Sequence, residues 1–287
     1  MINDIFAKFD GAFAKNTIRA YRSDFAQYQN WCLQNNLEPI PATADTIAMY
    51  VDYLSENNKS ATIRRRINSL GTVLKLSKNH DPTKDPEVIL ALKRMHRKIG
   101  RAQEQATPLT KTLLKQLLNN CDKSIIGIRN QVLLRLGYET MRRRSELCAF
   151  KFEDIDRAPN GKPIIRLNFS KTDQYGTGKV VPISEELLNL LEIWKEIVGD
   201  KGYILRSINR HGYFGDSLNP ASISTILKTL QEGLKSEKNQ QPLSGHSFRV
   251  GAALDLLEQG EPLEKIMLRG GWQSDSTAMK YLRNCVF

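Results

Sequence analysis

The chain has little of what metal and disulfide sites are built from. Its four cysteines lie far apart in 287 residues, without a C-x-x-C pair, at Cys32, Cys121, Cys148 and Cys285. This spacing argues against both a zinc site and a disulfide framework. There are also only four histidines and no H-x-H pair, and three of the four, His80, His96 and His211, are isolated. We read those three as structural or exposed, and we expect neither a metal nor a cofactor.

Long apolar runs are absent as well. No segment approaches the roughly 18 apolar residues of a membrane helix. The first residues carry an acid, Asp4, and no apolar stretch of the kind found in signal peptides. We therefore expect a cytoplasmic protein that does not associate with membranes.

Acidic residues are scarce relative to basic ones. The formal net charge is +11 and the pI is about 9.5. Much of the excess falls in residues 59–101, which hold twelve Lys or Arg and three acids. Such a cluster favours a polyanionic partner, and nucleic acid first.

What is present fits two domains. In the first 100 residues, apolar side chains recur at helical spacing, with predicted helix starts at Asn16, Ser60 and Asp85-Pro86. A further helix is expected over residues 46–54, and no segment there reads as a strand. The sequence therefore predicts an all-α domain over residues 1–100, with a polar linker at 101–109.

Residues 110–287 form the second predicted domain. Thr110 and Ser184 are expected to cap helices, and another helix is expected over about 125–138. Residues 163–170 alternate in polarity and face 179–183 across a Gly-containing turn, which predicts a β-hairpin. Residues 202–206 read as a short strand. The fold class is mainly α, with a small antiparallel sheet in the second domain.

Several reactive side chains recur in pairs at helical spacing. Arg143 and Glu146 are three residues apart, as are His246 and Arg249, so each pair shares a helix face if its segment is helical. Trp272 follows two glycines, and Tyr281 lies nine residues beyond it. Each residue alone more often has a structural role, and only the joint pattern points to chemistry.

This joint pattern resembles the catalytic signature of the tyrosine recombinases, the phage-integrase family. The motifs that carry the resemblance are R-x-x-E-L, a hairpin lysine, H-x-x-R, G-W and a late tyrosine. The spacing from Arg249 through Trp272 to Tyr281 is most similar to the Cre branch. The motifs cover about the last 180 residues. The resemblance extends to the first domain by organisation only.

The resemblance implies a site-specific recombinase that acts on chromosomal, phage or plasmid DNA. Tyr281 would attack a phosphodiester of double-stranded DNA at a specific recombination site and form a 3′-phosphotyrosyl intermediate. Lys171 would protonate the leaving 5′ oxygen, with Lys179 as its rival. Strands would be exchanged through a Holliday junction in a homotetramer, and the first domain would close on DNA as a clamp.

The remaining site residues follow from phosphoryl chemistry. Charge grows on the phosphate oxygens in the transition state, and forked guanidinium donors at Arg143 and Arg249 suit it better than ammonium groups. His246 could share the tyrosine proton. The indole N–H of Trp272 could bind phosphate, or its ring could pack on the tyrosine helix, and the two roles are compatible. Glu146 would hold Arg143 or His246 in place.

DNA contacts outside the reacting centre are expected from basic helices. The residues are Arg64, Arg65, Arg66, Lys93, Arg94, Arg97 and Lys98. Arg142 and Arg144 would either touch the DNA backbone or lie on a solvated face.

Two other functions stay open. A type IB topoisomerase would use similar chemistry without exchange, and a protein of the same fold could bind DNA without cutting it. Only six residues follow Tyr281, so we also expect monomers or weak association without DNA.

Overall fold

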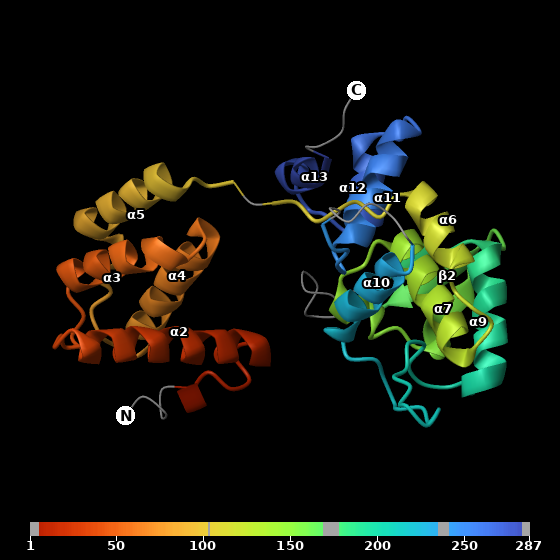
Figure 1. Cartoon of the computed structure of the whole chain (residues 1–287), viewed down its shortest axis with the longest axis horizontal. Helices are drawn as coiled ribbons and strands as arrows, with labels where there is room; N and C mark the ends of the chain where they lie inside the picture. The colour runs from red at the N-terminus through yellow and green to blue at the C-terminus, as the bar shows by residue number, and fades with distance from the viewer. Residues whose placement is uncertain (1–5, 103, 169–177, 235–240, 283–287) are drawn as a thin grey trace. The chain divides into compact units, whose positions relative to one another are not determined.

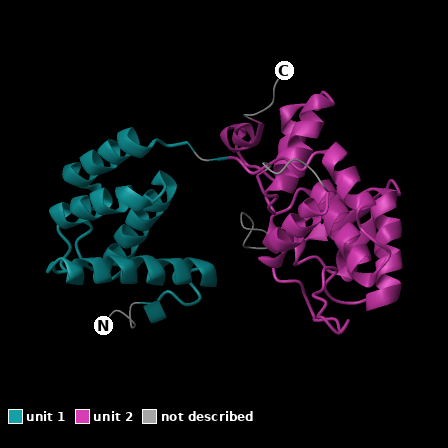
Figure 2. Cartoon of the chain, in the orientation of Figure 1, with its two compact units in different colours: residues 1–104 teal, residues 105–287 magenta. Residues whose placement is uncertain are grey.

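The computed structural model describes residues 6–102, 104–168, 178–234 and 241–282. The chain divides into two compact units, residues 1–104 and 105–287 (Figure 2). The first unit has one buried apolar cluster and the second has two. None of the helices in the described ranges has the length and apolar character needed to cross a bilayer.

The described part of the first unit is built of helices (Figure 1). They are α2 (Lys15–Gln34), α3 (Ala44–Asn57), α4 (Ser60–Leu76), a short 3-10 turn η1 (Pro82–Lys84) and α5 (Pro86–Ile99). Helix α3 packs against α5, and α2 packs against α4. Rows of apolar side chains at helical spacing fill the space between them, including Phe25, Tyr50 and Leu70.

The helix starts in this unit follow the sequence signals only in part. Asp85 caps α5 by accepting a hydrogen bond from the backbone of Glu87, with Pro86 at the first helical position, as predicted. The caps predicted at Asn16 and Ser60 are wrong, because each residue lies inside its helix, which begins after Ala14 or Lys59 without a side-chain cap.

The second unit is mainly helical. Its elements are α6 (Lys111–Asn119), α7 (Ile125–Thr140), α8 (Arg144–Leu147), η2 (Phe152–Asp154), β1 (Ile155–Arg157), β2 (Pro163–Leu167), β3 (Lys179–Pro182), α9 (Glu185–Val198), α10 (Ser222–Glu232), α11 (Ser247–Glu258), α12 (Leu263–Gly270) and α13 (Asp275–Leu282). Thr110 and Ser184 cap α6 and α9, as predicted. The mainly α fold class is confirmed.

The three described strands form one antiparallel sheet in the order β1-β2-β3. The predicted hairpin corresponds to β2 and β3, with Ile165 opposite Val181. Strand β1 was not predicted, because three residues carry too little alternation to be recognised. The strand expected at 202–206 is absent from this described stretch, where Tyr203 makes a single bridge to Lys151.

The start of the second unit is attached to α11. The backbone N–H of Leu109 donates to the carbonyl of Ser247 at 3.0 Å, and the Leu109 side chain is fully buried. Residues 105–109, which the sequence places in the linker, therefore belong to this unit. The second apolar cluster of the unit lies among α11, α12 and α13 and includes Met141, Val250, Ile266 and Trp272.

Candidate active site

Arg143 is presented by a tight turn after α7. Met141 ends that helix in the left-handed conformation, with φ 52°, and its side chain is fully buried. The turn places Arg143 at the N-cap of α8, where its backbone N–H donates to Oε2 of Glu146 at 3.1 Å. The Arg143 Nη1 donates to Oε1 of the same carboxylate at 2.9 Å. Of the two partners expected for Glu146, the geometry therefore shows Arg143.

The charge of Glu146 is stabilised by this pairing. The side chain is 4% exposed, and burial alone would raise its pKa. The hydrogen bonds from the Arg143 side chain and backbone outweigh burial and hold the pKa of Glu146 below its usual value. The carboxylate is thus ionised at neutral pH and orients the guanidinium of Arg143, which is 26% exposed.

Arg249 is a buried cation with unused donors. It lies in the first turn of α11, is fully buried, and donates from Nη1 to the carbonyl of Met141 at 2.6 Å. Its Nε and Nη2 have no acceptor among the residues that the structure describes. Burial lowers the pKa of Arg249, and the Arg143 charge lowers it further, while Tyr281 and Glu146 act in the opposite direction. Buried donors without partners are costly, so they indicate a site for an anion.

The tryptophan and the tyrosine lie against this arginine. The Arg249 guanidinium carbon is 5.0 Å from the centre of the Trp272 ring and 5.7 Å from that of Tyr281. The two rings are 4.8 Å apart, at 33° to each other. The Trp272 Nε1 is buried without an acceptor in the described ranges. Both roles considered for Trp272 are therefore compatible with its position.

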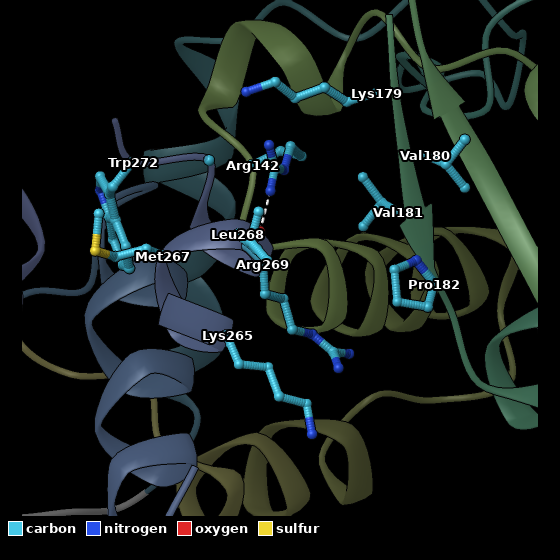
Figure 3. Close-up of a pocket in the computed structure, with 11 residues that line it drawn as sticks. Arg142, Lys179, Val180, Val181, Pro182, Lys265, Met267, Leu268, Arg269 and Trp272 are labelled. Carbon is cyan, nitrogen blue, oxygen red and sulfur yellow. Dashed lines mark hydrogen bonds between the residues drawn. The ribbon is translucent and has the colours of Figure 1, made fainter. Parts of the chain in front are cut away.

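The predicted histidine lies at the start of α11, and Lys179 lies at the start of β3. His246 is exposed at the start of α11, and its backbone N–H donates to Oγ of Ser244 at 3.3 Å. Lys171 lies outside the described residues. Its rival Lys179 begins β3 and lines a cavity of about 510 Å³ together with Arg142 and Trp272 (Figure 3). Lys265 lines the same cavity, so Lys179 is one of two described lysines that share it with Trp272.

A model of the phage integrase family matches residues 107–285, more than half of the chain. The chain belongs to the phage integrase family. It is 28% identical over 281 residues to an integrase/recombinase xerD homolog of Selenomonas ruminantium, covering 94% of this chain and 82% of that protein. It is 27% identical over 293 residues to the recombinase cre of Escherichia phage P1, covering 95% of this chain and 85% of that one.

Solved structures share the fold of this integrase-family chain. One is a lambda integrase tetramer bound to a Holliday junction, with a TM-score of 0.68 and 15% identity, covering 97% of this chain and 75% of that one. At that identity the likeness concerns the fold alone. The family resemblance inferred from the motifs is confirmed by the family match and by the two relatives.

The two arginines beside Arg143 are not fully exposed to solvent. Arg142 is only 3% exposed, donates from Nε to the carbonyl of Thr140 at 2.7 Å and also bonds the carbonyl of Arg269. Burial, followed by the Arg249 charge, lowers its pKa to about 10. The solvated face expected for Arg142 is therefore wrong, and its contact with DNA stays a prediction. Arg144 is partly exposed and donates to Oγ of Ser224 at 3.1 Å.

Two residues that contact the candidate site were not predicted from the sequence. Gln105 donates from Nε2 to the backbone carbonyl of Tyr281 at 2.5 Å. No local signal predicts a contact across 176 residues. Gly270 ends α12, and a Cβ there would lie 2.4 Å from the ring of Trp272. The double glycine before Trp272 is a signal that could have indicated this close packing.

The sequence also holds one carboxylate pair at D-x-D spacing, Asp154 and Asp156. Asp154 accepts from the backbone of Lys151, and Asp156 is paired with Arg166. Within the described ranges, no three side chains of His, Cys, Asp or Glu gather in a way that could hold a metal ion.

Proposed function

We propose that this chain is a site-specific DNA recombinase that cuts and rejoins DNA through a tyrosine. The observation that carries the proposal is Arg249, a fully buried guanidinium with two donor nitrogens, Nε and Nη2, that lack acceptors in the described structure, beside the ring of Tyr281. A phosphate oxygen would satisfy these donors and would lie close to the phenol. Membership of the phage integrase family supports the same reading.

In the proposed reaction, the Tyr281 oxygen attacks the phosphorus and the bond to the 5′ oxygen breaks. The intermediate is a 3′-phosphotyrosine, and the departing 5′ oxygen takes a proton. Arg143 and Arg249 donate to the non-bridging oxygens as their negative charge grows, and donors of this kind contribute roughly 3–4 kcal/mol each. The 5′-hydroxyl of a partner strand then attacks the phosphotyrosine, which restores the phenol and joins the strands.

Proton transfer is assigned to a lysine and to His246. We propose Lys171 as the general acid for the 5′ oxygen, with Lys179 as the alternative because it lines the cavity that Arg142 and Trp272 share. His246 would accept or share the phenolic proton. Glu146 would act through Arg143, whose guanidinium it holds at 2.9 Å.

The partner proposed is double-stranded DNA with a specific recombination site, bound by a homotetramer. The basic helices of residues 1–104 would bind DNA as the clamp domain. The xerD homolog and the recombinase cre carry recombinase names. This favours strand exchange over relaxation by a type IB topoisomerase, and cleavage over DNA binding alone.

A nicked suicide substrate tests the chemistry. The duplex carries a site enriched from a random pool by binding. After cleavage, the nick lets the short fragment with the new 5′-hydroxyl diffuse away. Wild type should form a covalent adduct, and Tyr281→Phe should form none while still binding. The matched control is Tyr213→Phe, which changes a 73% exposed tyrosine of the same unit and should react normally. A bound duplex without any Tyr281-dependent adduct would remove the proposal.

A second assay separates exchange from relaxation. Two duplexes of different length, each with the site, should yield recombinant lengths through a four-way junction. Relaxation of a supercoiled plasmid without recombinant products would instead assign the chain to topoisomerase-like activity.

A further inference from the structure

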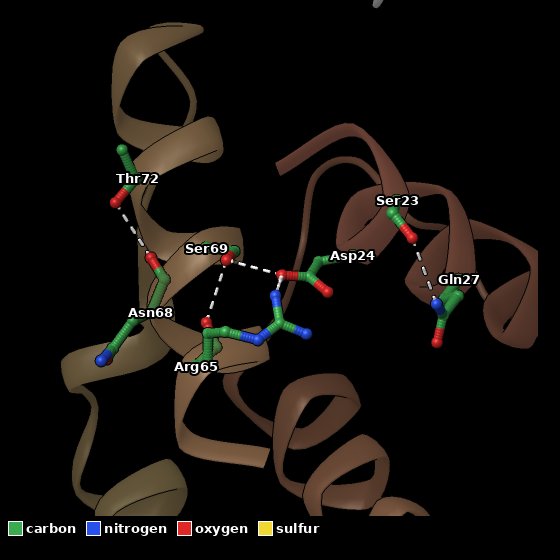
Figure 4. Close-up of polar contacts among 7 residues, drawn as sticks. All are labelled: Ser23, Asp24, Gln27, Arg65, Asn68, Ser69 and Thr72. Carbon is green, nitrogen blue, oxygen red and sulfur yellow. Dashed lines mark hydrogen bonds and ion pairs between the residues drawn. The ribbon is translucent and has the colours of Figure 1, made fainter. Parts of the chain in front are cut away.

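A buried carboxylate lies between two helices of the first unit. Asp24, on α2, is 1% exposed, while the same helix face buries Phe25 and Tyr28. Across the contact with α4, Asp24 forms an ion pair with Nη1 of Arg65 and accepts from Oγ of Ser69 at 2.7 Å (Figure 4). The Ser69 hydroxyl also bonds the backbone carbonyl of Arg65 at 2.9 Å.

Stability alone does not account for this pair. Removing a carboxylate from water is costly, and exchanging buried ion pairs for apolar side chains is often neutral or stabilising. The Arg65 side chain is 49% exposed, so water also screens its attraction to Asp24. What the pair does provide is position, because the contact with Asp24 anchors one end of the Arg65 guanidinium and leaves its other donors available.

The position matters because of what surrounds Arg65. Helix α4 contains no acidic residue over residues 60–76. Its polar side chains line a cavity of about 400 Å³ whose wall includes Arg64, Arg65, Asn68 and Thr72. Arg64, Asn68 and Thr72 are four residues apart in turn, so they form one stripe about 12 Å long. Among the described residues, no acceptor other than Asp24 is bonded to the Arg65 guanidinium.

These side-chain types are suited to reading base edges. Arginine pairs with the two major-groove acceptors of guanine, asparagine pairs with adenine, and threonine contacts the methyl group of thymine. An acid-free helix of this kind can approach DNA without repulsion from the phosphates. A stripe of about 12 Å spans three to four base pairs at about 3.4 Å each.

We propose that Asp24 is a positioning residue for sequence recognition. It holds Arg65 beside Arg64 and Asn68, so that α4 presents a fixed set of donors to the base pairs of the recombination site. This inference rests on the proposed function, and it adds which helix face selects the site and which buried group orients it.

Selection from a random pool of DNA duplexes tests the proposal. Wild type, Asp24→Asn, Arg65→Ala and the double variant are each used to enrich bound sequences. We expect Asp24→Asn and Arg65→Ala to lose preference at the same base pair, with roughly a tenfold loss of selectivity there. The double variant should lose no more than either single one. Because Asp24→Asn adds one unit of positive charge, its binding to DNA of any sequence should not weaken.

Glu104→Gln is the matched control. It also removes one negative charge in the first unit, from a pair with Lys59 at 3.0 Å in which both side chains are well exposed. It should retain the wild-type base preferences. Thermal unfolding of each variant reports whether the fold is intact. If Asp24→Asn unfolds, Arg65→Lys becomes the deciding variant, because lysine keeps the positive charge and lacks the planar fork. Arg65→Lys should lose the base preference and keep the salt dependence of binding.

Unchanged preferences in a folded Asp24→Asn or in Arg65→Lys would overturn the proposal, and so would a change spread evenly over all positions. The suicide-substrate assay keeps this result separate from the proposed function. A Tyr281 adduct with unchanged variant preferences removes only the role of Asp24, whereas a missing adduct removes the recombinase.

Discussion

Arg249 has an environment that does not suit a purely structural role, because its charge is buried and some of its donors lack acceptors in the described structure. A fully buried guanidinium bonded through Nη1 to the Met141 carbonyl leaves two donors without acceptors in the described structure. Its position over both aromatic rings partly stabilises the charge. A bound anion would offset the cost of burying the remaining donors, which is why we propose this site as the one that receives the phosphate.

Arg249→Lys separates charge from geometry. Lysine keeps the positive charge but lacks the planar fork, so we expect the rate of adduct formation to fall about 10²- to 10³-fold. Single-turnover cleavage of the suicide substrate measures this rate. Arg166→Lys, at an exposed arginine paired with Asp156, is the control and should react at the wild-type rate. A similar rate for both variants would contradict the role of the fork.

Glu146 predicts a pH dependence of stability with a defined sign. Its pKa is lower in the folded protein than in the unfolded chain, where glutamate titrates near 4.3. Its pairing therefore contributes stability that is fully present above the unfolded pKa and is lost as pH falls through the folded value.

Urea unfolding between about pH 3 and pH 6 measures this contribution. Wild type should lose free energy of unfolding more steeply on acidification than Glu146→Gln, which has no carboxylate to protonate. Glu258→Gln, at an exposed position of the same unit, should follow the wild-type curve. Parallel curves for wild type and Glu146→Gln would show that the pairing has no effect on stability.

Among the helices, α12 and α13 bring Trp272 and Tyr281 together. Gly270 ends α12 directly under the indole ring. Gly270→Ala would place a Cβ 2.4 Å from Trp272 Cε3 and force the ring away. We expect a loss of about 1–3 kcal/mol in the free energy of unfolding, as for other overpacked cores. Cleavage should slow as well, because the displaced ring lies against Tyr281.

Denaturant unfolding and adduct formation measure these two effects. Glu264→Gln in the same helix is the control, because Glu264 is exposed and lies outside the cavity lined by Trp272, so its change should alter neither quantity. Wild-type stability in Gly270→Ala would mean that the ring can move without cost.

The helices could be predicted because their signals are local. The caps at Asp85, Thr110 and Ser184 each depend on a residue next to the helix it starts, and all three are observed. Asn16 and Ser60 mislead because Asn and Ser, although favoured at N-caps, are also tolerated in a first turn when tertiary packing extends the helix. Strand β1 depends on pairing with β2, which the sequence of three residues does not encode.

The site shows the same division between local and long-range information. The spacing of Arg143 and Glu146 predicts a shared helix face, but Arg143 lies at the N-cap before α8, and the two residues meet as a capping box. Trp272 and Tyr281 follow from motif order, and their rings are in contact. The Met141 carbonyl that binds Arg249 is a backbone atom brought there by a left-handed turn 108 residues away. No residue type marks such a partner in the sequence.

For the whole chain, the charge distribution predicts steep salt dependence of DNA binding. Each phosphate contact releases counterions, so loss of one contact should reduce the slope of log K against log salt by about 1. Arg97 is exposed on α5, and Arg97→Gln should show this decrease equally on specific and random duplexes.

The control for that measurement is Arg157→Gln. Arg157 is also exposed, but it is paired with both carboxylate oxygens of Glu185, at 2.7 and 3.0 Å. Its charge is already compensated, so the slope should stay at the wild-type value. Fluorescence anisotropy over a series of salt concentrations gives both slopes, and an unchanged slope for Arg97→Gln would exclude that residue as a phosphate contact.

Gln105 connects the start of the second unit to helix α13. It is the first residue of the second unit, and it bonds the backbone carbonyl of Tyr281, while the next residue, Ala106, packs on the cluster that contains Trp272. The start of the second unit is therefore joined to the backbone at the C-terminal end of α13. Because the acceptor is a backbone carbonyl, a substitution of the side chain at position 281 leaves this hydrogen bond available.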